Sequence, residues 1–232
     1  MKLILDQVVA RRGRWSFMAQ GGFGSGIHLV TGDVGSGKST LALIMARLFP
    51  PEQGAVRSEQ ILTVMLSAQF PEFYLTGLTV AEECVSWGLD ADQILRAAGL
   101  CISTSTPPLC LSRGELKRLH LACILARQYD LLLLDEPFSS LDCSEKERLC
   151  TEISRRQDGI TILFTHEQAT FPHIDHIWEI ADNCLVDCGV LPGALERWQH
   201  APALVKKLVR AGRVPENLTS DNIREAACRT RG

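Results

Sequence analysis

The sequence predicts an α/β protein in which helices flank a mostly parallel sheet. Two segments carry this prediction. The apolar run 27–31 precedes a glycine-rich loop and a helix-forming run, and the apolar run 131–134 ends in Asp135 and Glu136. Apolar strands that alternate with helices are typical of parallel sheets covered on both faces. A chain of 232 residues is long enough to bury a full core.

The elements are expected in a fixed order along the chain. Hydrophobic periodicity and breaker residues divide the sequence into strands and helices. The expected strands are 2–9, 14–19, 27–31, 61–67, 130–134, 160–164 and a pair near 177–188, with a glycine loop over 21–26. Helical patterns cover 41–48, much of 79–127, 144–157 and the tail from 191 onward.

The glycine-rich loop fits the phosphate-binding pattern G-x-x-x-x-G-K-[ST]. Glycines let main-chain N–H groups turn toward phosphate oxygens, while the lysine reaches the β- and γ-phosphates and the serine can ligate Mg²⁺. The strand before the loop and the helix after it favour this interpretation over a chance glycine turn. We therefore predict a nucleoside triphosphate site that contains Gly32, Gly35, Ser36, Gly37, Lys38, Ser39 and Thr40.

Polar residues also follow the other predicted strands. Asp135 is a candidate Mg²⁺ ligand, and Glu136 is a candidate general base that orients the attacking water. Gln69 follows a strand and could contact the metal or the water. His166 stands at the tip of another strand, where it either bonds the γ-phosphate or is an ordinary surface histidine. Together with the loop, these residues predict triphosphate hydrolysis.

Two further polar groups begin predicted helices. Ser112 is a good N-cap and Glu115 completes a capping box, so an ordinary helix start is one interpretation. The other is that this helix N-terminus offers a hydroxyl and main-chain N–H groups to a phosphate. Asp142 likewise follows a turn and is suited to cap the next helix.

Composition argues against several classes of protein. A net charge of −3 gives no reason to expect nucleic-acid binding. No apolar run approaches the roughly 18–20 residues that cross a bilayer, and a charge follows the first residues too soon for a secretory signal. Cys184 and Cys188 form a weak C-x-x-x-C metal signal, with reduced buried thiols as the alternative. These features predict a cytoplasmic protein.

The order of the motifs resembles that of the ATP-binding-cassette (ABC) ATPases throughout residues 1–190. The phosphate loop, Gln69, Leu-Ser-Arg-Gly-Glu at 111–115, Leu-Leu-Leu-Leu-Asp-Glu, Ser-Leu-Asp and Thr-His follow one another as in that family. The resemblance implies a P-loop fold with an antiparallel β part and a helical subdomain, about 70–128, inserted in an ATPase domain over 1–190. It also implies a C-terminal helical extension over 191–232.

The same resemblance implies an ATPase that uses ATP and Mg²⁺ and closes into a head-to-tail dimer with a second ABC ATPase subunit, of the same or a different chain. It assigns catalysis to Glu136, His166 and Gln69, and Mg²⁺ to Ser39, Gln69 and Asp135. Asp142 is expected to couple the two subunits. The residues at the start of the helix that Ser112 caps are expected to act on the nucleotide of the opposite subunit. They are Ser112, Arg113, Gly114 and Glu115.

The segment 68–89 is similar to the region after the glutamine in energy-coupling-factor and cobalt-type importer ATPases. This implies a transmembrane coupling protein, a substrate-capture membrane protein, and import of a vitamin or transition-metal ion. The chain is then expected to lie peripherally on the inner face of the cell membrane, without a nucleic-acid partner. The tail is richer in Lys and Arg than in Asp and Glu, which fits a solvated helical face or a contact with acidic lipid or a partner.

Departures from the family pattern leave alternatives open. Arg113 replaces a glycine and Glu115 a glutamine of the usual Leu-Ser-Gly-Gly-Gln motif. The first strand has no aromatic residue at its end for stacking on adenine, and Trp15 is either the substitute or a core residue. A weakly hydrolysing regulatory partner of a second ABC ATPase is therefore the alternative function. A soluble ABC ATPase of DNA repair or translation is disfavoured because there is no long coiled-coil insertion or second cassette.

Overall fold

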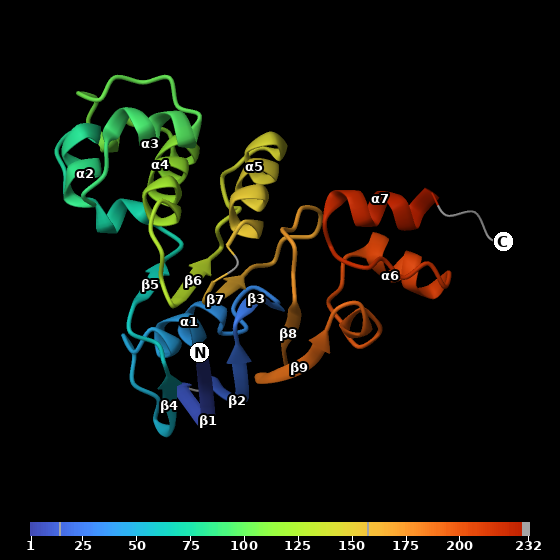
Figure 1. Ribbon diagram of the computed structural model, residues 1–232. Coiled ribbons are helices and arrows are strands. Elements are labelled where there is room, and N and C mark those ends of the chain that lie inside the picture. The colour runs from blue at the N-terminus through green and yellow to red at the C-terminus, as the bar shows by residue number, and fades with distance from the viewer. Residues whose placement is uncertain (14, 157, 229–232) are drawn as a thin grey trace.

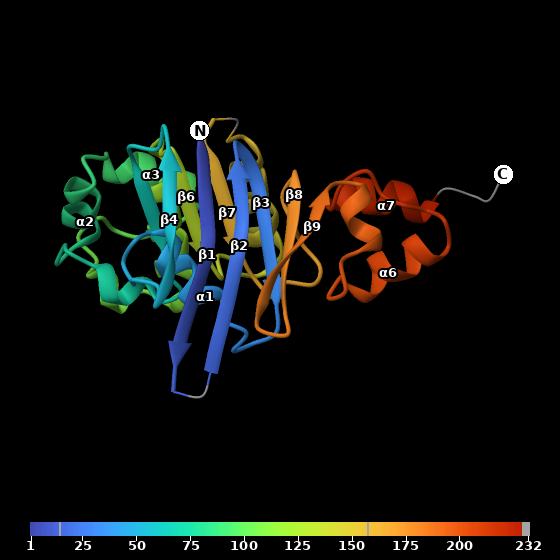
Figure 2. The same ribbon diagram turned by 90° about the horizontal axis from the view of Figure 1, so that it is seen from below.

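The strands join into one sheet in which parallel and antiparallel pairs meet. The computed structural model describes residues 1–13, 15–156 and 158–228. The strands in these ranges are β1 (Lys2–Arg12), β2 (Trp15–Gly24), β3 (Gly26–Gly32), β4 (Gln53–Glu59), β5 (Val64–Ser67), β6 (Leu131–Asp135), β7 (Ile160–Phe164), β8 (His176–Ala181) and β9 (Cys184–Val190). They follow the order β4-β1-β2-β9-β8-β3-β7-β6-β5, and the curved sheet is seen best in Figure 2.

The parallel part of the sheet confirms the predicted α/β class. Strand β3 pairs in parallel with β7 and β8, and β6 pairs in parallel with β5 and β7. Every residue of β6 and β7 is buried, as expected for strands covered on both faces. Because parallel strands end at the same edge of a sheet, the residues that follow β3, β5, β6 and β7 are brought close together.

The antiparallel part corrects one prediction. The expected loop over 21–26 is wrong for most of its length, because Gly21 to Gly24 belong to β2 and pair with β1. The ring of Trp178 lies 2.7 Å from the position that a Cβ at Gly21 would occupy. The glycine is therefore required by close packing rather than by a turn. Strand β4 was not predicted, since it is a largely exposed edge strand without an apolar pattern.

Helices lie at several places around the sheet, with one group beyond β5 and β6 and another beyond β8 and β9 (Figure 1). One group includes the helices between β5 and β6, whose own small core contains Val80, Ile94 and Leu119. The α-helices are α1 (Lys38–Met45), α2 (Val80–Ser86), α3 (Ala91–Ala98), α4 (Arg113–Leu125), α5 (Cys143–Ser154), α6 (Ala203–Arg210) and α7 (Ser220–Cys228), and the 3₁₀-helices are η1 (Pro71–Tyr74), η2 (Pro108–Cys110) and η3 (Gly193–Glu196). Residue 157, at the end of the helix expected over 144–157, lies outside the described residues.

The tail after β9 packs against the sheet. Trp198, Val205 and Leu218 belong to the same core cluster as Leu29 and Leu163 of the central strands. This contact holds η3, α6 and α7 beside β8 and β9, as Figure 1 shows. The final residues of the expected extension, 229–232, lie outside the described part of the chain.

The two cysteines of the C-x-x-x-C signal lie on β9, outside the predicted phosphate site. Cys188 is buried on β9, in agreement with the buried-thiol alternative, and Cys184 is partly buried. Within the described ranges, no three His, Cys, Asp or Glu side chains gather in a way that could hold a metal ion. None of the helices in these ranges has the length and apolar character that crossing a membrane requires.

Candidate nucleotide-binding site

A cavity of about 360 Å³ lies where the carboxyl ends of the parallel strands meet. It brings together residues of β2, the glycine loop, α1 and the segments after β5, β6 and β7. Its lining consists of Trp15, Val34, Gly35, Gly37, Lys38, Ser39, Thr40, Gln69, Glu136 and His166. Asp135 borders a neighbouring cavity that shares Ser39 and Gln69 with the first. Most of the predicted site residues are thus adjacent in space.

The glycine loop has the conformation that its sequence requires. Gly32, Gly35 and Gly37 have φ values of 150°, 83° and 110°. At Gly37, the N-cap of α1, the ring of Trp15 lies 2.5 Å from where a Cβ would be. Glycine is the only residue that combines this positive φ with this close approach. The loop therefore leads directly into the first turn of α1, whose free N–H groups form an anion site.

Lys38 places a cation on the wall of the cavity. Its side chain is buried, and Nζ donates hydrogen bonds to the carbonyl oxygens of Gly32 (2.8 Å) and Asp33 (3.0 Å). Burial lowers the pKa of Lys38, while the carboxylates of Glu136 and Asp135 oppose that shift. A lysine held in this way is suited to phosphate oxygens, because its compact ammonium can donate several bonds.

The donor set beside Ser39 fits Mg²⁺. Oδ1 of Asp135 is buried and has no hydrogen-bond partner among the described residues. Burial raises the pKa of Asp135, and a hydrogen bond from the Ser39 hydroxyl opposes this shift. Gln69 lines both cavities at this point. Carboxylate, hydroxyl and amide oxygens are the ligands that Mg²⁺ prefers, so Ser39, Gln69 and Asp135 would hold the ion.

Glu136 is held at the cavity by two neighbouring residues. His166 Nδ1 lies 2.7 Å from Glu136 Oε1, and Thr165 Oγ1 donates to Oε2 at 3.1 Å. The main chain of Glu136 has a φ of 49°, which is strained for a residue with a side chain. Thr165 was not among the predicted site residues, although its position directly before His166 at the end of β7 was a usable signal. The carboxylate is thus oriented to accept a proton at the cavity.

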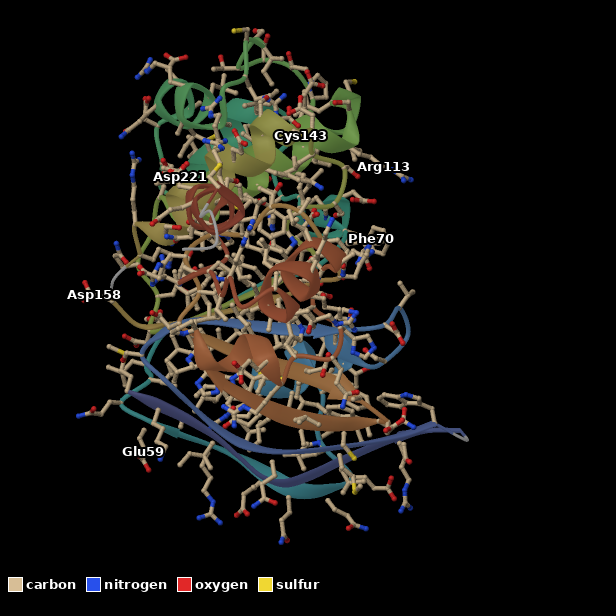
Figure 3. The ribbon with its side chains drawn as sticks, turned by 90° about the vertical axis from the view of Figure 1, so that its right-hand side faces the viewer. Glu59, Phe70, Arg113, Cys143, Asp158 and Asp221 are labelled. Atoms are coloured by element: carbon tan, nitrogen blue, oxygen red, sulfur yellow. The ribbon has the colours of Figure 1, made fainter. Side chains whose placement is uncertain are left out.

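The helix start at Ser112 does not reach this cavity. Ser112 caps α4, and Glu115 Oε2 accepts hydrogen bonds from Ser112 N (2.9 Å) and Ser112 Oγ (2.7 Å). The capping-box interpretation is therefore confirmed for the single chain. Arg113 borders a different cavity, beside Gln69 and Lys117. Figure 3 shows Arg113 projecting from the molecular surface on the same side as Phe70.

Lys117 is a buried cation that was not among the predicted site residues. Its Nζ donates to the carbonyl oxygen of Gln69 at 3.3 Å, which joins α4 to the segment after β5. Burial lowers the pKa of Lys117 to about 8, and Asp135 and Glu136 oppose the shift. The sequence signal for this residue was a lysine among the apolar residues of a predicted helix. Its charge contributes to the positive potential beside the carboxylates.

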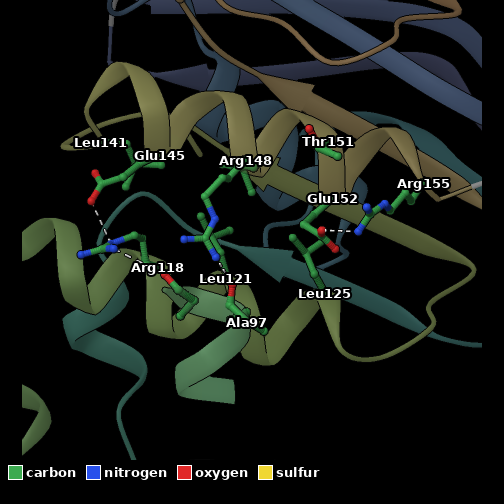
Figure 4. A pocket seen from close by; sticks show the side chains of 13 residues that line it. Ala97, Arg118, Leu121, Leu125, Leu141, Glu145, Arg148, Thr151, Glu152 and Arg155 are labelled. Carbon is green, nitrogen blue, oxygen red and sulfur yellow. Dashed lines mark hydrogen bonds and ion pairs between the residues drawn. The ribbon is translucent and has the colours of Figure 1, made fainter. Parts of the chain in front are cut away.

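Asp142 caps α5 and is linked to α4 through one glutamate. Its carboxylate accepts from Glu145 N (2.8 Å), and Glu145 Oε2 accepts from Asp142 N (2.9 Å). The other oxygen of Glu145 pairs with Arg118 Nε at 3.0 Å, as Figure 4 shows. The turn that holds Asp142 and the helix that Ser112 caps are therefore joined within one chain.

The chain is similar in sequence to known ATP-binding proteins of transporters. A sequence profile described as ABC transporter matches residues 24–139. The aliphatic sulfonates import ATP-binding protein SsuB 2 of Frankia alni is 32% identical over 167 residues, which cover 68% of this chain and 64% of that protein. This chain thus spans less than two thirds of SsuB 2. The energy-coupling factor transporter ATP-binding protein EcfA1 of Thermotoga maritima is 32% identical over 192 residues, 74% of each chain.

The fold is similar to that of a solved transporter as well. The structure of a bacterial Atm1-family ABC exporter with ATP bound matches with a TM-score of 0.73 and 21% sequence identity. The match covers 86% of this chain and 41% of that one. At this level of identity the similarity concerns the fold alone.

Proposed function

The chain belongs to the ABC transporter family, and from this premise we propose that it is an ATP-hydrolysing subunit that energises a membrane importer. The observation that carries the proposal is the cavity in which the phosphate loop, Gln69, Glu136 and His166 meet. A cation, a metal-binding donor set and a positioned carboxylate surround one space there. That combination is what hydrolysis of a triphosphate requires.

Nucleotide binding is assigned to the loop and α1. Lys38 and the N–H groups from Gly35 to Thr40 would contact the phosphates, with Mg²⁺ held by Ser39, Gln69 and Asp135. When bound, Mg²⁺ neutralises charge on the phosphate oxygens. Trp15 lines the same cavity and lies parallel to Phe17, with 6.0 Å between the ring centroids and 2° between the planes. Its position supports Trp15 as the aromatic platform for the base.

Hydrolysis is assigned to Glu136. Its carboxylate accepts a proton from the attacking water as the water approaches the γ-phosphate. Thr165 and His166 fix the orientation of this carboxylate through the contacts given above. His166 is also exposed to the cavity, where it can donate to a γ-phosphate oxygen.

A second ABC ATPase subunit, of the same or a different chain, would complete the site. Ser112 to Glu115 lie outside the cavity of their own chain, which supports their action on the nucleotide of the opposite subunit. Asp142 stands in the turn before α5 and would contact the partner. Glu145 and Arg118 connect the turn before α5 to α4. A movement of one of these regions on dimer closure would therefore displace the other.

The importer is proposed to be of the energy-coupling-factor type, for a vitamin or a transition-metal ion. Support comes from the segment 68–89 and from the similarity to EcfA1, whereas the fold itself is shared with an exporter. The chain would lie on the inner face of the membrane beneath a transmembrane coupling protein and a substrate-capture protein. Phe73 and Tyr74 of this segment are exposed and offer an apolar contact surface for the coupling protein.

A second candidate function has a specific observation in its favour. The hydroxyl of Ser112 is engaged by the Glu115 carboxylate, which brings negative charge to the place where a phosphate of the opposite subunit would bind. A weakly hydrolysing partner of a more active ABC ATPase would have such a feature. Turnover by the purified chain alone would reject this candidate.

The substitution Glu136→Gln tests the catalytic assignment. It keeps the shape of the side chain and removes its ability to accept a proton, so ATP binding should persist while hydrolysis falls at least about 100-fold. The ATP-bound variant should also accumulate as a closed dimer, measurable by size-exclusion chromatography with light scattering. The control is Glu59→Gln, an exposed change on β4. Hydrolysis at the wild-type rate by Glu136→Gln would reject the assignment.

A further inference from the structure

Glu179 is a buried carboxylate in the strand beside the phosphate loop. It lies in β8, opposite Thr31 of β3, and is 1% exposed. A buried carboxylate is tolerated only where donors surround it. Within the described part of the chain, Glu179 receives its hydrogen bonds from the segment after η3. Glu179 accepts hydrogen bonds from Gln199 N (3.1 Å), His200 N (2.5 Å) and His200 Nδ1 (2.6 Å).

The same segment also contacts the start of the phosphate loop. Trp198 Nε1 donates to Thr31 Oγ1 at 2.7 Å, and both side chains are buried. On the other side of Gly32, His200 Nε2 lies 3.6 Å from Asp33 Oδ1. Trp198 is thus hydrogen-bonded to the residue before Gly32, and the His200 ring lies beside the side chain of the residue after it. The carbonyl oxygens of Gly32 and Asp33 are the acceptors that fix the Lys38 amine.

A second contact fixes the tail farther along. The side chain of Asn217 is buried, accepts from Ile174 N at 2.9 Å and donates to Ile174 O at 2.8 Å. Ile174 lies between His166 and β8. The tail is thus attached both to the phosphate loop and to the segment that follows His166, and it is not a loosely appended end.

We propose that Trp198 and His200 are positioning residues for the nucleotide, which act by holding the phosphate loop between β3 and the tail. This inference rests on the proposed function, because it assumes that the loop binds ATP. Through Thr31 and Asp33, the two side chains fix the main chain that holds Lys38. A preorganised loop binds phosphate more tightly, since less ordering is needed on binding. Neither residue lines the cavity or touches Glu136.

The test measures binding of a fluorescent ATP analogue to the full chain by titration. His200→Ala and Trp198→Phe should each weaken binding about three- to tenfold, the range expected for loss of one hydrogen bond or ion pair. Trp198→Phe keeps a ring in the core and removes only the N–H donor. The matched control is His173→Ala, which removes another histidine that pairs with an aspartate, Asp175 at 3.3 Å, away from the loop. The control should bind like the wild type.

A double-mutant cycle separates positioning from loss of stability. If His200 acts through Asp33, then His200→Ala should have little further effect in an Asp33→Ala background, whereas a general loss of stability would add in both backgrounds. Thermal unfolding of each variant confirms that it is folded at the temperature of the titration. Wild-type affinity in both His200→Ala and Trp198→Phe, or full additivity in the cycle, would overturn the inference and leave the proposed function intact. Absence of ATP binding by the wild-type chain would overturn both.

Discussion

Glu115 shows how one substitution can change a shared motif. Its carboxylate completes the capping box of α4 and accepts the Ser112 hydroxyl. Hydrogen bonds from Ser112 lower the pKa of Glu115, so the side chain is ionised at neutral pH. Arg113 lies two residues before it and carries the opposite charge. The net charge offered to an opposite subunit therefore depends on which of the two side chains approaches the phosphate.

Glu115→Gln is expected to strengthen the ATP-dependent dimer about two- to fivefold, because it removes a like charge near the phosphate. Glutamine preserves the capping box, so the helix start remains intact. The measurement is the ATP concentration that produces half-maximal dimer, at low and at high salt. The increase in dimer affinity should be smaller at high salt, because salt screens the charge of Glu115 in the wild type. A weaker dimer in this variant would show that Glu115 contributes a needed contact rather than repulsion.

At the residue scale, the sequence motifs selected side chains that the structure brings together. Lys38, Gln69, Glu136 and His166 were all selected from the sequence, and all line one cavity. The position of Thr165 directly before His166 was a signal, but the role of Thr165 became visible only in the structure, where its hydroxyl donates to an oxygen of Glu136. Glu136 follows a different strand, and a contact between neighbouring strands has no fixed spacing in the sequence.

At the scale of elements, α4 carries polar groups on a buried face. His120 is 7% exposed, its Nε2 has no hydrogen-bond partner among the described residues, and its ring packs edge-on against Trp87. Burial and, to a smaller extent, the charge of Lys117 lower the pKa of His120 to about 4, although Glu83 opposes the shift. The helix therefore contains a histidine that remains neutral until the solution is acidic.

This histidine makes stability depend on pH. In the unfolded chain His120 takes up a proton near pH 6.5, but in the folded chain only near pH 4. As the pH falls through this window the unfolded state gains protons first, so the free energy of unfolding decreases. The free energy of unfolding of the wild type should fall between pH 7 and pH 5. In His120→Leu this decrease should be smaller by about 2 kcal/mol.

Urea unfolding at the two pH values measures the effect of His120→Leu. The exposed control His173→Leu should leave the wild-type loss largely unchanged. Equal losses in His120→Leu and the wild type would mean that other groups, such as buried His28, dominate the acid response. The pKa of His28 is also lowered by burial, to about 4.

The sequence predicted the bounds of some strands well and those of others poorly. Strands β6 and β7 are uninterrupted apolar runs, and their observed bounds agree with expectation to within one residue. The glycines of β2 indicate a loop when read locally, yet they pair with β1 and accommodate the Trp178 ring. Local propensity does not predict this strand, because the packing of Trp178 from β8 requires a glycine at position 21.

At the scale of the whole molecule, apolar side chains gather at one exposed place. Phe70, Phe73 and Tyr74 are 47%, 79% and 49% exposed, and they border a cavity that also includes Leu43 of α1. Phe70 and Phe73 contact each other edge to face, with 6.3 Å between centroids. Exposed apolar patches of this kind mark interaction sites. The patch adjoins Gln69, so a partner bound there is next to the nucleotide cavity.

Phe73→Ser is expected to reduce co-purification with the proposed transmembrane coupling protein at least about fivefold, because an anchoring aromatic residue is lost. ATP binding by the isolated chain should change little, since Phe73 borders the neighbouring cavity beside Asp135 and does not line the nucleotide cavity itself. The control is Leu62→Ser, which removes another strongly exposed apolar side chain outside this patch. Equal recovery of the partner with both variants would reject the patch as the docking surface.

The phosphate loop, the acidic strand end and the family could be recognised from the sequence, because each depends on residues that are close together along the chain or follow a fixed order. The folded structure settled which surfaces meet. It placed Ser112 away from its own cavity, buried Lys117 beside Gln69, and joined Trp198 and His200 of the tail to Thr31 and Asp33. Such contacts link residues that are distant in sequence, and the packing of one shared core fixes them.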